Sequence, residues 1–394
     1  MGFTKPKKAI GLDIGAHAVK AVQMSRASGR LRVEAATCAL VDRNQLNADP
    51  VLAQTIAVRE ALESMPVSQS HVVAALPGQT VVVRYPRLTD VPRDQISAAV
   101  AREAQSNIPY KLDEVFLDWV VLDEYKEEER HQMKVLLVAA KHDVIEMRLQ
   151  ILRSAEVECA VLDVDSLALA DAAEACGFLR SGETVAMVNI GLTSSSVHFI
   201  KDGVSNFIRE VNWGARELVQ SVAKGRRFSY EEAVAIIEGY SQEQDHAEMP
   251  EALEAVETEF DIPSIADAEP PLASEPFAEV SDMGSSYLDP LDEEFDAVGS
   301  AVSETFQDSP DSKPFVRKAQ PMESLVATPL NRMGIELRRS FDFYEHQLYE
   351  RPVDRILLSG GPASFPLVAK TLKEELGFNA IEIANPAKKT SSSL

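Results

Sequence analysis

Apolar residues follow the same succession of strands and turns in two separate segments of the chain. The first segment contains AIGLDIGAHAVKAVQM (9–24) and the β-rich run LRVEAATCALV (31–41). The second contains ETVAMVNIGLTSSSVHFI (183–200) and VSNFIREV (204–211). Each pattern predicts three strands, the first two joined by a tight turn at a glycine. Each also places a short polar side chain two residues before that glycine: Asp13 before Gly15, and Asn189 before Gly191. Such an internal duplication predicts two similar lobes.

The segment between the two copies, residues 71–158, has a different order of elements. HVVAALPGQTVVVRYPRL predicts two strands around a Pro-Gly turn, and RDQISAAVAREAQSNI predicts a helix that Pro109 ends. VFLDWVVLDEY and QMKVLLVAAK predict strands joined by a charged turn, and DVIEMRLQILRSA predicts a second helix. This order predicts a small α+β subdomain inserted into the first lobe.

After the helix predicted for SYEEAVAIIEGY, the periodicity is lost from about residue 241 to residue 320. The stretch 241–312 contains 21 of the 62 acidic residues of the chain and none of its 39 lysines and arginines. Its apolar residues occur singly, so it cannot bury enough apolar surface to offset the entropy lost on ordering. We therefore expect a long disordered acidic insertion.

Periodicity returns at about Met322. ESLVATPLNRMGIELRRSFDFYEHQL predicts a helix or a helix pair, and DRILLSGGPASFPLVAKTLKEELG predicts strand, Gly-Gly turn and helix. The expected organisation is a first-lobe core (1–70, completed by 159–180), the inserted subdomain (71–158), a second lobe (181–240 and 321–388), the acidic insertion (241–320) and a polar tail (389–394).

Composition excludes several classes of function. The net charge of −23 comes almost entirely from the acidic stretch, and the remainder is nearly neutral, so no basic surface indicates nucleic-acid binding. The cysteines Cys38, Cys159 and Cys176 form no metal-binding pattern and are typical of free thiols in a reducing compartment. No apolar run is long enough to cross a membrane, so a cytoplasmic protein is expected.

The glycine turns are the candidate ligand-binding elements of the chain. The sequence has no Walker A motif, nucleophile elbow or zinc-protease motif. A tight turn at a glycine exposes backbone N–H groups that suit phosphate oxygens, and two such turns from opposite lobes can hold a polyphosphate. A carboxylate beside the turn can hold hydrated Mg²⁺, Lys20 can offer a charge to a phosphate, and Gly360-Gly361 would let the backbone approach a nucleoside. Taken singly, each is also explained as an ordinary turn glycine or a solvated lysine.

The ordered set of motifs resembles the actin, Hsp70 and sugar-kinase superfamily. GLDIGAHAVK (11–20) and VNIGLTSSSV (188–197) are similar to its two phosphate motifs, and ILLSGGPASFP (356–366) to its adenosine motif. Within that superfamily ALPGQTVVVR, VLDVDSLAL, FIREVNWGARELVQ and ELRRSFDFYE resemble the PilM family of type IV pilus assembly. The resemblance covers about 1–240 and 322–388. It implies a two-lobed actin-like (ribonuclease H-like) α/β fold with ATP and Mg²⁺ bound between the lobes.

The resemblance also implies site residues by motif position. Asp13, Gly15, Ala16, His17 and Lys20 would face phosphates, with Asp13 holding the metal. Asn189, Gly191 and Thr193 would face them from the second lobe. Gly214, Glu217, Gly360 and Gly361 would lie near the ribose or adenine. Asp163 or Asp165 could orient the attacking water, but an ordinary capping or solvated aspartate is the favoured explanation of both.

Asn189 stands where the second phosphate motif usually has an aspartate. Loss of that carboxylate should weaken hydrolysis more than binding, because phosphoryl transfer depends on positioning and electrostatics. We therefore expect nucleotide binding with weak or no ATPase activity.

The resemblance implies a scaffold that recruits the cytoplasmic N-terminal tail of a PilN-type inner-membrane protein. Such a protein would link the motor to the alignment complex of the pilus, contact other inner-membrane components and reach the membrane only through partners. A homo-oligomer is a further expectation. Two alternatives remain open: an FtsA-like division or cell-shape protein, and a small-molecule kinase of the same superfamily.

Overall fold

A computed structural model describes residues 8–27, 30–67, 70–240, 320–378 and 380–385. The expected acidic insertion, apart from Gln320, and the expected polar tail lie outside these ranges. No helix in the described ranges is both long and apolar enough to cross a bilayer.

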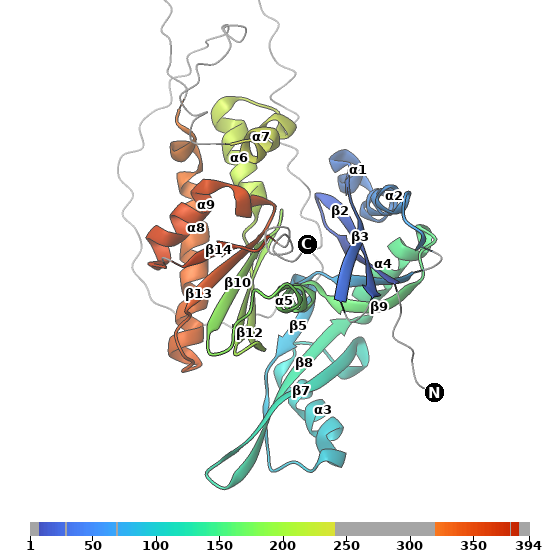
Figure 1. Ribbon diagram of the computed structural model, residues 1–394, viewed down its shortest axis with the longest axis vertical. Coiled ribbons are helices and arrows are strands. Elements are labelled where there is room, and N and C mark those ends of the chain that lie inside the picture. Colours follow the sequence, from blue (N-terminus) through green and yellow to red (C-terminus); the bar gives the residue numbers. More distant parts are fainter. Residues whose placement is uncertain (1–7, 28–29, 68–69, 241–319, 379, 386–394) are drawn as a thin grey trace, which may run out of the picture. The chain divides into compact units, whose positions relative to one another are not determined.

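Two five-stranded sheets share one topology (Figure 1). The first has the order β3-β2-β1-β4-β9, and the second β12-β11-β10-β13-β14. In each, the first strand of the copy pairs antiparallel with the next strand of the chain and parallel with a strand from much later. The strands of the first sheet are β1 (Lys8–Ile14), β2 (Ala18–Ala27), β3 (Arg30–Leu40), β4 (His71–Leu76) and β9 (Cys159–Val164). Those of the second are β10 (Thr184–Ile190), β11 (Ser195–Lys201), β12 (Val204–Val211), β13 (Arg355–Gly360) and β14 (Ile381–Ile383). The two-lobed α/β architecture expected from the duplication is confirmed.

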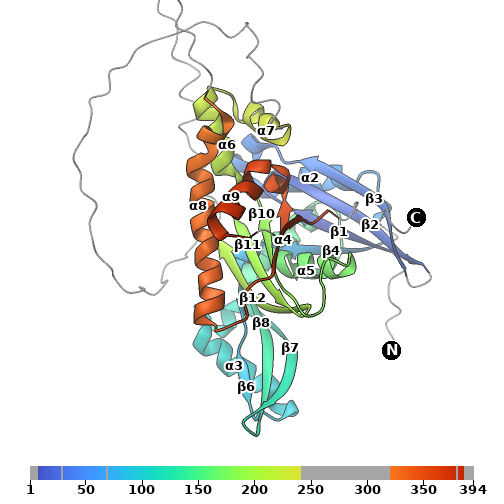
Figure 2. The same ribbon diagram turned by 60° about the vertical axis from the view of Figure 1, so that its left-hand side comes forward.

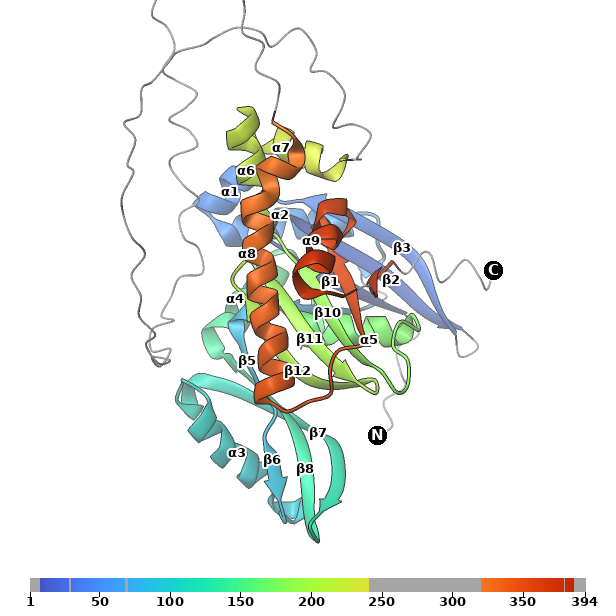
Figure 3. The same cartoon turned by 90° about the vertical axis from the view of Figure 1, so that its left-hand side faces the viewer.

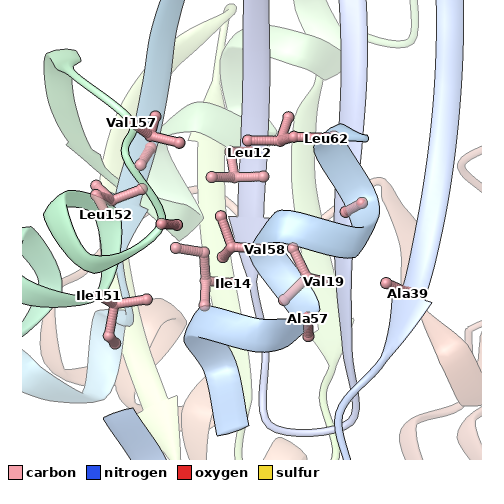
Figure 4. Close-up of a cluster of buried hydrophobic side chains, with 14 of the residues drawn as sticks. Leu12, Ile14, Val19, Ala39, Ala57, Val58, Leu62, Ile151, Leu152 and Val157 are labelled. Atoms are coloured by element: carbon pink, nitrogen blue, oxygen red, sulfur yellow. The ribbon is translucent and has the colours of Figure 1, made fainter. Parts of the chain in front are cut away.

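One face of the first sheet is covered by α2 (Pro50–Leu62) and α4 (His142–Ser154), with α1 (Arg43–Ala48) at its edge. Alternate strand residues such as Leu12 and Ile14 point into this core and meet Val58 and Leu152 from the helices (Figure 4). Asp49 accepts a hydrogen bond from the amide of Leu52 and thereby caps α2, and Pro50 follows at the first helical position.

The second sheet is packed on both faces. The long helix α8 (Met322–Asp342) lies beside α6 (Ala215–Arg226) and α9 (Pro366–Leu376) (Figure 2). On the other face, α5 (Asp165–Ala175) packs with Phe178 against Val185, Met187 and Leu357. Burial on both faces explains why β10 is apolar at nearly every position.

The segment that predicted a helix or a helix pair forms one helix, α8, followed by a single π-helical turn (Phe343–Gln347). Pro329 lies inside α8 and has no N–H to donate to the carbonyl of Leu325, one turn earlier. The hydroxyl of Ser221 on α6 donates to that carbonyl instead, at 2.6 Å. The proline is tolerated because the neighbouring helix satisfies the group it leaves free.

The inserted subdomain is a four-stranded antiparallel sheet with one helix on one face (Figure 3). Its elements are β5 (Val81–Arg84), β6 (Arg87–Thr89), α3 (Ile96–Asn107), β7 (Val115–Glu127) and β8 (Arg130–Lys141). Val100 and Ala104 of α3 pack on Met133 and Leu137 of β8.

The boundaries expected for this subdomain, 71–158, are too wide. β4 (71–76) pairs with β1 in the first sheet, and α4 (142–154) packs into the first-lobe core through Ile151 and Leu152. The first of the two strands predicted around Pro77-Gly78 is therefore part of the first lobe. Local patterning predicted these elements, but only pairing across the sheet assigns them to a lobe.

Candidate functional site

The two hairpin turns predicted to bind phosphate have the same backbone geometry. In the first, the amide of Gly15 donates to the carbonyl of Ala18 at 3.1 Å. In the second, the amide of Gly191 donates to the carbonyl of Ser194 at 3.0 Å. A Cβ at either glycine would lie 2.9 Å from that carbonyl oxygen, closer than real Cβ atoms come. Each turn thus requires its glycine for the same steric reason.

Asp13 and Lys20 occupy opposite positions on the two strands of the first hairpin. Nζ of Lys20 donates to the carboxylate of Asp13 at 3.1 Å, and the side chains are 57% and 61% exposed. So exposed a pair adds little stability. Both groups are accessible to a ligand and bring opposite charges to the turn.

The tip of the first hairpin is held by the rest of its lobe. The carbonyl of Gly15 accepts a hydrogen bond from Nε2 of Gln54, and that of His17 from the amide of Val41. Ala16 packs against the first-lobe core. These contacts hold the turn in position.

The second hairpin is tied to α6. The carbonyls of Gly191 and Leu192 accept hydrogen bonds from the amides of Ala215 and Arg216, each at 2.9 Å. The first amides of α6 therefore bond to the turn itself. Thr193 lies in this turn, between Leu192, which is bonded to α6, and Ser194, which is bonded to Gly191. Asn189 lies at the end of β10, where its Oδ1 accepts from Oγ of Ser359 at 3.2 Å.

Gly214 and Gly360 pack directly against this second turn. A Cβ at Gly214 would overlap the carbonyl of Leu192, and a Cβ at Gly360 would overlap that of Ile190. Gly360 also has a φ of 93°, which disfavours any side chain. Gly361 has no atom within 4 Å of its would-be Cβ. The structure thus brings together predicted residues from three separate segments of the chain: Gly191 and Thr193 of the second turn, Gly214, and Gly360.

Glu217 follows on the first turn of α6. Its carboxylate accepts from Nη1 of Arg332 on α8 at 3.1 Å. Burial raises the pKa of Glu217, and the guanidinium of Arg332 partly opposes this. Glu217 therefore joins α6 to α8 beside Gly214.

Asp165, at the start of α5, is more than a solvated or capping aspartate. Its Oδ1 accepts from the amide of Gly78 at 2.9 Å and from its neighbour Ser166. The pKa of Asp165 is raised to about 6, because burial and, to a smaller extent, the charge of Asp13 raise it by more than those hydrogen bonds lower it. The negative charge of Asp13, on the first hairpin, therefore affects the ionisation of Asp165. Asp163 accepts only from the adjacent amide of Val164 among the hydrogen bonds described.

Sequence analysis missed Glu210, on β12. A Cβ at Gly78 would meet carboxylate oxygens of both Glu210 and Asp165, so three segments of the chain converge there. Burial first, and then the charge of Asp165, raise the pKa of Glu210 to about 8. Its Oε1 is buried and has no hydrogen-bond partner among the described residues. In the sequence Glu210 is one of two adjacent charged residues near the end of the β-rich run VSNFIREV, which does not mark it as part of a site.

This arrangement fits a magnesium nucleotide. Two glycine turns of matching geometry and two glycines in close backbone contact suit phosphates and a nucleoside. Among the described residues, no group of three or more His, Cys, Asp or Glu side chains could hold a metal ion. Mg²⁺ does not need such a cage, because it binds through one or two carboxylates, water and substrate phosphates.

Comparison with known proteins gives two kinds of match. The family model described as "Type IV pilus assembly protein PilM" matches residues 11–248. The solved structure "PilM-PilN type IV pilus biogenesis complex" is similar to this chain with a TM-score of 0.67 and 20% identity, covering 97% of this chain and 89% of that one. The ethanolamine utilization protein EutJ from Carboxydothermus hydrogenoformans matches with a TM-score of 0.48 and 12% identity, covering 97% of this chain and 86% of its own.

Proposed function

The chain belongs to the PilM family of type IV pilus assembly proteins, and from this premise we propose that it is an ATP-binding scaffold that recruits a PilN-type tail. The observation that carries the nucleotide part is the pair of hairpins with matching hydrogen bonds, at Gly15 and Gly191. The partner part is supported by the fold shared with the PilM-PilN complex.

In this proposal the backbone of both turns holds the phosphates of ATP. Gly214 and Gly360 keep the second turn in place and leave room for the nucleoside beside Gly361, Glu217 and Arg332. Asp13 and Lys20 would exchange their mutual contact for Mg²⁺ and a phosphate. When bound, Mg²⁺ supplies positive charge that neutralises the phosphates.

We propose that the nucleotide acts mainly as a ligand that stabilises one arrangement of the lobes. A ligand that binds only the folded protein stabilises it by mass action. Asn189 provides no second carboxylate, and the described hydrogen bonds of Asp165 go to backbone amides. Slow turnover, or none, is therefore expected.

For the tail we propose a docking surface on the inserted subdomain. Phe116 and Val120 of β7 are 59% and 50% exposed. They alternate with Leu117 and Trp119, which pack in the core beneath α3, so they lie on the opposite face of the sheet. On that face their cross-strand neighbours are Ala140 and Leu136. An exposed apolar surface of this kind suits the apolar side chains of a peptide.

β7 also offers backbone groups for an extended peptide. It pairs with β8 along its length, and within the described part of the chain no strand pairs with its other edge. A tail that joins this edge would gain main-chain hydrogen bonds while Phe116 and Val120 supply specificity. Binding would attach the protein, as a cytoplasmic component, to the inner membrane through its partner.

Calorimetric titration tests both parts. Mg²⁺-ATP should bind with one-to-one stoichiometry, and a synthetic N-terminal tail of the cognate PilN-type protein should then bind the ATP-loaded sample saturably. Phe116→Ser should weaken tail binding about tenfold or more, since a buried aromatic anchor often contributes over 1 kcal/mol. Tyr349→Ser removes another exposed aromatic, 89% exposed on the second lobe, and should leave tail binding unchanged.

Failure of the tail to bind a folded, ATP-loaded sample would contradict the partner assignment. Binding of the folded protein to liposomes without any partner would favour an FtsA-like protein instead. Substrate-dependent ADP release in a screen of small molecules would favour a kinase.

A further inference from the structure

α7 (Tyr230–Glu238) belongs to the second lobe but touches the first lobe at both of its ends. Cζ of Arg43, the first residue of α1, lies 4.3 Å from the ring centroid of Tyr230. At the other end, Glu238 lies 4.0 Å from Nε2 of His17, at the tip of the first phosphate hairpin. α7 therefore connects the two lobes directly beside that hairpin.

Within the second lobe, α7 is fixed to the elements that form the rest of the nucleotide site. It packs against α6, whose first amides bond to the second hairpin, and against residues 361–364 after Gly360. Just beyond α7, the ring of Tyr240 meets the edge of Phe365 with 5.2 Å between centroids. The second lobe thus holds α7 as part of its own body, and the contacts to Arg43 and His17 are the ones that separation of the lobes would break.

The two contacts differ in expected strength. Tyr230 is only 9% exposed, and a guanidinium over a ring shielded from water is worth more than one at the surface. His17 and Glu238 are 42% and 68% exposed, so their pair contributes little. Burial raises the pKa of the Tyr230 hydroxyl, while the charges of Arg43 and Arg216 lower it, so a guanidinium from each lobe lies near this ring.

The start of α7 is capped by its own side chains. Ser229 and Glu232 form a capping box, in which each side chain bonds to the backbone amide of the other residue. Tyr230 follows the cap directly, so its ring is presented in a fixed direction.

We propose that Arg43 and Tyr230 form a clasp between the lobes that must open before bound nucleotide can leave. This inference rests on the proposed nucleotide site and adds the step that controls its exchange. Nucleotide release requires the lobes to part, and the clasp adds its contact free energy to the barrier of that step. Association is affected less, because the clasp closes after the nucleotide has entered.

Stopped-flow release of a fluorescent ATP analogue, chased with excess Mg²⁺-ATP, tests the clasp. Arg43→Gln and Tyr230→Leu should each accelerate release about two- to fivefold, which corresponds to the usual strength of a cation–π contact. The double variant should be no faster than the quicker single variant, since both changes remove one contact. Tyr230→Phe retains the ring and should release nucleotide at the wild-type rate.

Two controls separate the clasp from general damage. Arg102→Gln removes an exposed arginine of α3 and should not change the release rate. Melting temperatures of all variants are compared, because a loosened fold would also release nucleotide faster. Wild-type rates in folded Arg43→Gln and Tyr230→Leu, or multiplicative effects in the double variant, would overturn the clasp.

The clasp can also be tested without nucleotide. Hydrogen exchange of the nucleotide-free protein should be faster in α1 and α7 of Arg43→Gln than in wild type. If wild-type protein binds no nucleotide but this difference appears, the clasp stands and the nucleotide proposal fails. If hydrogen exchange in α1 and α7 is equally fast in Arg43→Gln and in wild type, the clasp itself is wrong.

Discussion

The two hairpins that we propose bind phosphate have the same backbone geometry but differ in their side chains. Gly15 and Gly191 make the same turn with the same hydrogen bond, inside sheets of the same strand order. At matching positions the first hairpin carries the charged pair Asp13 and Lys20, whereas the second carries Asn189, bonded to Ser359. The duplication therefore preserves the geometry that suits phosphate and leaves the charge on one lobe.

This difference separates two tasks that a nucleotide site performs. Backbone amides can hold phosphates from either lobe, because every residue except proline supplies an N–H group. Mg²⁺ sites in proteins usually include one or two carboxylates, and among the described residues of the two hairpins only Asp13 offers one. We therefore expect the first lobe to govern the Mg²⁺ dependence of binding and the second lobe to govern the shape of the site.

The largest effect is expected from Gly360→Ala, which tests the shape of the second lobe. The new Cβ would overlap the carbonyl of Ile190, and the φ of 93° disfavours any side chain. The free energy of unfolding should fall by about 2–4 kcal/mol, with loss of nucleotide binding. Thermal or urea unfolding measures the change.

Alanine substitutions at two other glycines show how much of the stability loss expected for Gly360→Ala comes from steric overlap. Gly361→Ala, with no neighbour and no positive φ, should unfold like wild type. Gly203→Ala has a φ of 79° but open space, so it should lose only about 1 kcal/mol. Equal losses at Gly203 and Gly360 would show that contact with the second hairpin is unimportant.

Asp13→Ala tests the charge of the first lobe. We expect Mg²⁺-ATP affinity to drop about tenfold or more, because the candidate metal ligand is lost. Affinity for ATP in EDTA should fall much less, because no metal is bound and Lys20 is freed from its partner. Asn189→Ala is the matched change on the second lobe and should have the smaller effect on Mg²⁺-ATP. Equal effects of the two variants in calorimetry would contradict the division of tasks.

Glu210→Gln tests the ionisation of the one carboxyl group that β12, in the second lobe, places beside Gly78. Its folded pKa of about 8 lies above the ordinary 4.5, so the folded protein keeps a proton that the unfolded chain releases between these values. Stability should therefore be lost as pH rises from 4.5 through 8. Glutamine removes this loss and should stabilise the protein at pH about 9 by on the order of 1–3 kcal/mol.

Chemical denaturation at several pH values measures that difference. The variant and the wild type should have nearly the same stability near the ordinary pKa of glutamate, where the wild-type carboxyl is protonated in the folded state. A constant difference between the two proteins at all pH values would show that Glu210 ionises normally.

The smallest effect is expected from Asn189→Asp, which makes the hairpins more alike. A second carboxylate should raise Mg²⁺-ATP affinity by about two- to threefold through another ligand for the hydrated metal. Stability should be unchanged, because Ser359 can donate to a carboxylate as well as to an amide. Weaker Mg²⁺-ATP binding in calorimetry would show that repulsion from Asp13 and Asp165 dominates.

The sequence by itself determined the duplication and the glycine turns. Strand alternation, a polar residue before each turn glycine and a later Gly-Gly turn are local patterns, so they can be recognised without knowing the fold. The matching strands and turns of the two sheets follow from these patterns, and helical periodicity separately predicted α3 and α4. The role of each predicted site residue remains a prediction, although the structure brings Gly191, Gly214 and Gly360 together.

Only the tertiary structure decided which lobe each element joins and which distant groups meet. β4 is assigned to the first lobe by pairing with β1, and Glu210 meets Asp165 only because β12, α5 and Gly78 converge. The Arg43–Tyr230 contact likewise joins helices from different lobes. Contacts of this kind depend on how the lobes pack, and nothing in the local sequence around either partner encodes the identity of the other.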